Sequence, residues 1–157
     1  MSREINGWMA EPLWRQVKAS MPIPCVDIII SNGKRAVLLG WRVIHPYVNV
    51  WATPGGRIRF GESPVKAARR ILSSHGLRAS NFYLVGVFPI MFPSRFDISI
   101  CIATTGYSGS PIPDGTEFTK IQWFKKLPQG TGKNYVEMIK KWRRIRMCPQ
   151  ALKINRL

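Results

Sequence analysis

A glycine-rich loop that leads into a basic helix carries the residues best suited to chemistry. It reads GGRIRFGESPVKAARRILSSHGL and spans residues 55–77. Gly55 and Gly56 allow a backbone to approach a ligand without obstruction by side chains. Guanidinium groups suit phosphate because they donate paired, charge-assisted hydrogen bonds. The stretch contains four of them, on Arg57, Arg59, Arg69 and Arg70. It therefore predicts a binding site for a phosphorylated ligand.

Glu62 and Arg70 are spaced so that their side chains can meet. Arg70 follows Glu62 by eight positions, about two turns of a helix, so both can lie on one face. Two interpretations stay open at this point. In the first, the two residues belong to a functional site in which Arg70 can contact phosphate. In the second, the two residues form an ion pair with a purely structural role.

The same stretch resembles the Nudix box, a motif of glycine, glutamate, arginine and paired glutamates at fixed spacing. Gly56, Glu62 and Arg70 are in register with it, and Gly76 closes it one residue early. MPIPCVDIIISNGKRAVLLGWR, from residue 21, and VWATPGGR, from residue 50, extend the similarity. They resemble the GDP-mannose mannosyl hydrolase branch of the Nudix hydrolase superfamily. The resemblance implies an α/β (α+β) Nudix fold, in which a mixed β-sheet is sandwiched between helices.

Members of that branch cleave a nucleotide sugar by substitution at the sugar carbon, which releases GDP. The resemblance implies catalytic roles for Asp27, Arg42 and Glu62. Fixed cations would stabilise the charge that grows on a departing diphosphate. The predicted substrate-binding residues are accordingly Arg42, Arg57, Arg59 and Arg70.

The box is degenerate where a metal should bind. Ser74 replaces one of its glutamates and His75 falls on the other. Imidazole suits Zn²⁺ or Mn²⁺ better than Mg²⁺. The branch also carries a metal-binding amide and a general-base histidine, and an alignment on Trp123 turns these into Glu117 and Phe118. Glu117 can ligate a cation, whereas Phe118 cannot accept a proton. The predicted metal ligands are Gly56, His75 and Glu117, for Mg²⁺ or Mn²⁺ that is held weakly or not at all.

The elements that must position these residues follow from hydrophobic periodicity and turn residues. We predict a helix within 8–20, a hairpin over 25–43 that turns at Asn32–Gly33, and a helix over 63–75 capped by Ser63. Further strands are predicted within 49–60, 81–92, 96–107 and 118–125.

A last helix is amphipathic and basic. Tyr135, Met138 and Trp142 form an apolar stripe, which lysines and arginines flank until Pro149 ends the helix. We expect the stripe to dock on the core. The length of 157 residues is that of one domain, so we predict a single Nudix domain over 1–157. Within it, 1–20 is an N-terminal helical segment and 133–157 is a basic C-terminal helix and tail.

Composition bounds the partners and the compartment. Twenty-four Lys and Arg face eight Asp and Glu, a net charge of +16, which attracts nucleotides, nucleic acid or an acidic membrane surface. No apolar run reaches the length of a transmembrane helix and no signal peptide is recognisable, so we expect a cytoplasmic protein. The resemblance also suggests a homodimer.

Two functions compete. The first is a Nudix hydrolase that acts on a nucleotide sugar or another nucleoside diphosphate derivative, with weak activity or altered metal use. The second is a catalytically inactive Nudix domain that binds nucleotide or nucleic acid through its arginines. A protein-interaction role for the basic C-terminal helix is the third and least specific alternative.

Overall fold

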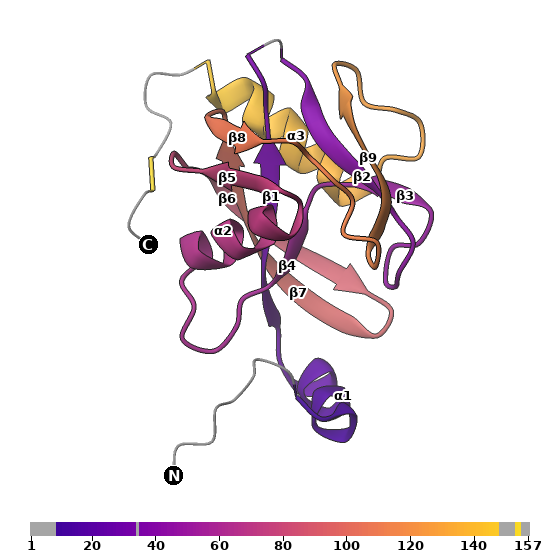
Figure 1. Ribbon diagram of the computed structural model, residues 1–157. Coiled ribbons are helices and arrows are strands. Elements are labelled where there is room, and N and C mark those ends of the chain that lie inside the picture. Colours follow the sequence, from indigo (N-terminus) through magenta and orange to yellow (C-terminus); the bar gives the residue numbers. More distant parts are fainter. Residues whose placement is uncertain (1–8, 34, 148–152, 155–157) are drawn as a thin grey trace.

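A computed structural model describes residues 9–33, 35–147 and 153–154. Within these ranges, twelve elements follow one another (Figure 1). They are α1 (Glu11–Ser20), β1 (Ile23–Ile30), β2 (Val37–Arg42), β3 (Val50–Ala52), β4 (Gly55–Arg57), α2 (Pro64–Ser74), β5 (Leu77–Ala79), β6 (Tyr83–Phe92), β7 (Arg95–Thr104), β8 (Tyr107–Gly109), β9 (Phe118–Phe124) and α3 (Lys133–Ile145).

The strands form three sheets. The largest has the order β4-β1-β7-β6, the second β3-β2-β9, and the third pairs β5 with β8. In the largest sheet β1 runs parallel to β7 and antiparallel to β4, so the sheet is mixed. The predicted fold class, a mixed sheet flanked by helices, is confirmed.

The predicted hairpin over 25–43 is wrong. Both edges of β1 are already paired, one with β4 and one with β7, so β2 cannot lie beside it. After β1 the chain leaves the first sheet, and β2 belongs to the second. A single bridge between Ser31 and Val37 is the place where the two segments still pair. Burial explains the choice, since seven of the eight residues of β1 are buried, as expected for a central strand covered on both faces.

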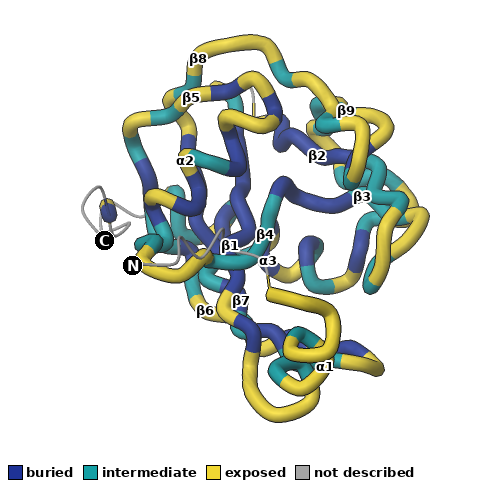
Figure 2. Tube along the Cα trace, turned by 60° about the horizontal axis from the view of Figure 1, so that its bottom comes forward, coloured by how far each residue is buried: buried dark blue, intermediate teal, exposed yellow. Residues whose placement is uncertain are grey.

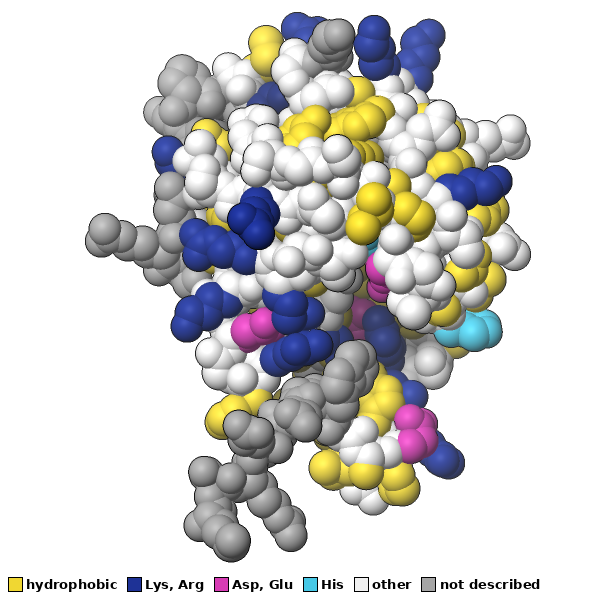
Figure 3. Space-filling model, in the orientation of Figure 1, with side chains coloured by type: hydrophobic (Ala, Val, Ile, Leu, Met, Phe, Trp, Pro, Cys, Tyr) yellow, Lys and Arg dark blue, Asp and Glu magenta, His cyan; other side chains and the backbone are white. Residues whose placement is uncertain are grey.

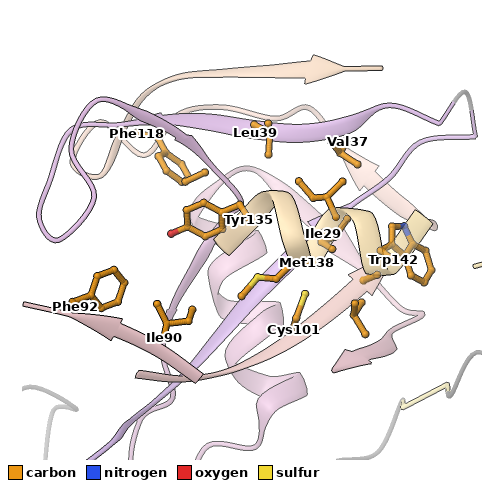
Figure 4. Packing of buried hydrophobic residues seen from close by; sticks show 14 residues of the cluster. Ile29, Val37, Leu39, Ile90, Phe92, Cys101, Phe118, Tyr135, Met138 and Trp142 are labelled. Atoms are coloured by element: carbon orange, nitrogen blue, oxygen red, sulfur yellow. The ribbon is translucent and has the colours of Figure 1, made fainter. Parts of the chain in front are cut away.

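Helices α2 and α3 cover opposite faces of the β1–β7 sheet (Figure 1). Successive side chains of β1 alternate between them: Ile28 and Ile30 pack with α2, and Ile29 packs with α3. The stripe on α3 is buried as predicted, with Met138 and Trp142 directed into the core (Figure 4). Pro149, the predicted stop of this helix, lies outside the described residues.

The start and end of α2 match the sequence signals. The Ser63 hydroxyl accepts a hydrogen bond from the Lys66 N–H, and Pro64 takes the first turn, where it loses no helical hydrogen bond. Gly76, at φ +71°, allows the left-handed backbone that follows the last turn. Both ends of α2 are therefore fixed by local interactions, and the helix gives the preceding loop a rigid support.

Helix α1 has no buried residue and lies at the edge of the molecule (Figure 2). It is at the bottom of Figure 1, and its Trp14 contacts Arg57 of β4. Within the described part of the chain, no helix combines the length and apolar character needed to cross a bilayer.

Truncation of the α3 stripe should destabilise the domain. Met138 is fully buried, so Met138→Ala leaves a cavity, and we expect a loss of about 2–5 kcal/mol in the free energy of unfolding. Lys140→Ala, on the exposed face of the same helix, should change it by less than about 0.5 kcal/mol. Urea denaturation followed by circular dichroism measures both. Equal losses for the two variants would contradict the docking of this stripe.

Candidate active site

The predicted pair of Glu62 and Arg70 forms in the structure. Arg70 Nε lies 2.6 Å from Glu62 Oε1, and Arg70 Nη2 lies 2.8 Å from Glu62 Oε2. Arg70 also donates to the Arg57 carbonyl at 2.9 Å, and the Arg59 N–H donates to Glu62 at 2.9 Å. The hydrogen bonds from Arg70 hold the pKa of Glu62 below its ordinary value. The pair therefore fastens the loop 57–62 to α2, and the guanidinium of Arg70 is directed at this loop.

A wide cleft of about 770 Å³ opens between this loop, α1 and the segment before β9. Arg57, Arg59 and Arg70 all line it. Arg57 stacks on Trp14 of α1, with its Cζ 4.1 Å from the ring centroid, and burial lowers its pKa. In Figure 3 basic side chains gather around acidic ones over the loop before α2. The cleft thus presents cations at its mouth.

A smaller recess of about 310 Å³ joins the cleft. Trp14, Ile44, Gly55, Gly56, Arg57 and Glu117 line both spaces. The buried carboxylate of Asp27 lies in the recess and accepts a short hydrogen bond from Ser99. Burial raises the pKa of Asp27 to about 6, although the Ser99 hydroxyl and the charge of Arg42 oppose that rise. A side chain at Gly55 would collide with this carboxylate, so glycine is required there.

A second acid in the recess escaped the sequence reasoning. Asp97 is buried, and its Oδ2 lies 2.7 Å from Arg95 Nη2 and 3.7 Å from Cys25 Sγ. Burial, followed by the charge of Asp97, raises the pKa of the Cys25 thiol. Among the described residues, Asp97 Oδ1 and Arg95 Nε have no hydrogen-bond partner, although both atoms are buried. The recess therefore offers hydrogen-bonding capacity that the protein itself leaves unused.

A periodic signal could have found this acid. In RFDISIC the polar residues Asp97 and Ser99 alternate with apolar ones, which places them on one face of β7. CVD in β1 has the same alternation, and the parallel register sets Cys25 opposite Ser99. Two strands with polar groups on the same face indicate a polar recess between them.

Arg42 links the recess to the cleft. Its guanidinium pairs with Glu117 and donates to the carbonyls of Ile44, at 3.2 Å, and His45, at 3.1 Å. Arg42 and Asp27, two of the three predicted catalytic residues, both line the recess. Glu117 lines both spaces at their junction.

The predicted metal positions, Gly56, His75 and Glu117, lie along the cleft, but the two side-chain donors among them are engaged. The His75 ring is buried, its Nδ1 lies 3.2 Å from the Ile112 carbonyl oxygen, and burial lowers its pKa. Glu117 is paired with Arg42, and Asp114 Oδ1 accepts from three successive backbone N–H groups that begin at Thr116. In the described ranges no three His, Cys, Asp or Glu side chains are grouped to hold a metal. These residues do not fit a tightly bound divalent cation.

Phe118, aligned with a general-base histidine, belongs to the core. It is fully buried, lines neither the recess nor the cleft, and stacks on His75 at 5.4 Å between ring centroids. Figure 4 shows its ring close to Tyr135 among the apolar side chains.

The sequence and the fold are similar to those of known proteins. A family model described as NUDIX domain matches residues 21–127, more than half of the chain. A MutT NUDIX hydrolase from Burkholderia pseudomallei superposes with a TM-score of 0.71 at 19% identity, over 78% of this chain and 98% of that one.

Two further structures contain ligands. The NUDIX domain of Shewanella oneidensis NrtR, complexed with ADP ribose, has a TM-score of 0.69 at 17% identity, over 87% of this chain and 98% of that one. A bifunctional NMN adenylyltransferase/ADP ribose pyrophosphatase from Francisella tularensis, complexed with AMP and a Mn ion, has a TM-score of 0.65 at 16% identity. That match covers 85% of this chain and 44% of the other. The family match, supported by the shared fold, shows that the chain belongs to the NUDIX domain family.

Proposed function

We propose that this protein hydrolyses a nucleoside diphosphate derivative, and that a nucleotide sugar such as GDP-mannose is its substrate. One observation carries the proposal: an arginine-lined cleft opens directly into a recess that contains the buried carboxylate of Asp27. Cations suit a diphosphate, and a carboxylate suits the hydroxyl groups of a sugar. Structural neighbours that contain ADP ribose or AMP support a ligand of this class.

Asp27 is suited to act as the general base. A carboxylate with a pKa of about 6 is ionised at neutral pH and accepts a proton more readily than an ordinary one. In the proposed step a water oxygen bonds to the sugar carbon while that carbon's bond to the diphosphate oxygen breaks. The water proton passes to Asp27, and the electron pair of the broken bond leaves with the diphosphate.

Arg42, Arg57 and Arg59 are proposed to meet the charge on the departing diphosphate. Arg57 and Arg59 line the cleft, and Arg42 lines the recess beside Asp27. Glu62 and Arg70 are assigned a positioning role, because their shared hydrogen bonds hold the loop that carries Arg57 and Arg59. This role follows the structural interpretation of the pair, because the contacts of both side chains are made within the protein.

A divalent cation is proposed to bind weakly. When bound, such an ion neutralises phosphate charge. Gly56, His75 and Glu117 stay the proposed ligands, but Glu117 would have to leave Arg42, which opposes binding. The fixed guanidinium groups would therefore supply most of the positive charge that the substrate meets.

The second candidate function is a NUDIX domain that binds nucleotide without turnover. The positions of Ser74 and Phe118 favour it, because the first lacks a carboxylate and the second is a core residue. The two candidates are separated by an assay for release of GDP from GDP-mannose, and of AMP from ADP ribose, with calorimetric binding in parallel. Binding of both compounds without any turnover would reject hydrolysis in favour of this second function.

Loss of Arg57 should weaken binding. Its charge-assisted contacts with phosphate contribute about 1.5–3 kcal/mol, so Arg57→Gln should raise the Kd for GDP-mannose roughly tenfold to a hundredfold. Arg78→Gln is the matched control, because Arg78 is exposed on β5 and lines neither the recess nor the cleft. Calorimetry measures both, and equal weakening would place the ligand elsewhere.

The pH profile should report the titration of Asp27. Below its pKa of about 6 the carboxyl is protonated and cannot accept a proton, so kcat/KM, which reports the free enzyme, should fall about tenfold per pH unit in that range. Ser99→Ala removes a hydrogen bond that favours the charged form, so the midpoint should move to higher pH. Asp27→Asn should lower kcat about 100- to 10,000-fold. A wild-type midpoint that Ser99→Ala leaves in place would contradict the assignment.

A restored carboxylate should strengthen metal binding. Ser74 is exposed and lines the cleft, whereas its exposed neighbour Ser73 does not. We expect weak Mg²⁺ binding in the wild type, and tighter binding in Ser74→Glu through the added hard oxygen ligands. Ser73→Glu adds the same charge and should change the affinity little. Micromolar Mg²⁺ binding to the wild type would show that the proposed ligand set is incomplete.

A further inference from the structure

A second basic site lies away from the recess and the cleft, and the proposed hydrolysis makes no use of it. It is a groove of about 340 Å³, called here the basic groove, between the β1–β2 turn, the residues after β9 and the end of α3. The lining consists of Arg35, Lys125, Arg143, Arg146 and Met147. Four of these five residues are cationic and none is acidic.

The cations in the basic groove lie close together, and no acidic side chain of the described residues lines the groove with them. Arg143 Nη2 donates to the Lys125 carbonyl at 2.8 Å, and burial, followed by the charge of Arg146, lowers the pKa of Arg143. Arg146 Nε is buried and has no hydrogen-bond partner among the described residues. Crowded guanidinium groups with unused donors are the arrangement that an anion stabilises.

Acidic residues are concentrated at the candidate active site and are scarce near the basic groove. Five of the eight in the sequence are at the candidate active site: Asp27, Glu62, Asp97, Asp114 and Glu117. On α3 the only acidic residue is Glu137, which pairs with Lys140 at 3.6 Å. The end of the molecule that contains the basic groove therefore carries a large share of the net charge of +16. Figure 3 shows basic side chains along the upper edge of the molecule, near the turn before β2 and the end of β9.

We propose that the basic groove binds the phosphodiester backbone of a nucleic acid. Exposed cations continue beyond it, with Lys126 after β9 and Arg144 on α3, so the surface suits an extended polyanion better than one isolated phosphate. A membrane fits less well. The apolar stripe of α3 is buried in the core, so this helix has no hydrophobic face to insert between lipids.

The test is fluorescence anisotropy with a labelled single-stranded oligonucleotide of about 20 nucleotides and the duplex of the same sequence. The groove variant is Arg35→Gln/Lys125→Gln, in which both side chains are exposed and the fold is spared. The matched control is Lys66→Gln/Arg78→Gln, also exposed, which removes the same charge but lies outside all three spaces.

We expect the groove variant to weaken binding at least tenfold at about 50 mM salt, and to reduce the slope of log K against log salt by about two. The control should change the affinity less than about threefold, and hydrolysis of GDP-mannose should be unaffected in both. Three results would overturn the proposal. Equal weakening by the two variants would mean that binding depends only on net charge. Displacement of the oligonucleotide by GDP-mannose would place the oligonucleotide in the cleft. Binding of vesicles with anionic lipid, without binding of either oligonucleotide, would show that the groove binds a membrane.

Discussion

The parallel register between β1 and β7 is the constraint on which the candidate site depends. It pairs Ile23 with Asp97, Cys25 with Ser99 and Asp27 with Cys101. Side chains at every second position of the two strands therefore point to the same face, toward α3, and the intervening ones point to α2. A slip of β1 by one residue would turn the Asp27 carboxylate into the apolar layer under α2 and direct the neighbouring isoleucines into the recess, away from Asp97 on β7.

A second constraint is the pair of Glu62 and Arg70. Loops before helices are mobile unless something fastens them, and here a two-point ion pair joins the loop to a helix that is itself packed on the sheet. The pair is partly exposed, so its value lies in geometry more than in stability. It holds the backbone that carries Arg57 and Arg59, which places two cations at the mouth of the recess.

Parts of this arrangement could be predicted from the sequence because they rest on local chemistry. The Ser63 cap, the positive φ of Gly76, the stripe on α3 and the pairing of Glu62 with Arg70 all follow from spacing along the chain. The hairpin failed because strand pairing is decided by which partners remain for a central strand, and that is not local. For Asp97 the alternation of polar and apolar residues in β7 was a local signal, but its place in the same recess as Asp27 follows only from the pairing of β7 with β1.

Alignment with a motif also has limits here. It placed Phe118 at a base position, where the structure shows a ring packed against His75 and facing the core.

The central claim is that the diphosphate and the sugar occupy two joined spaces. A crystal structure with bound GDP-mannose tests it most directly. The account predicts the diphosphate against Arg57 and Arg59, with the hexose hydroxyls within hydrogen-bond distance of Asp27 and Asp97. A hexose directed to solvent, with the recess filled only by water, would contradict it.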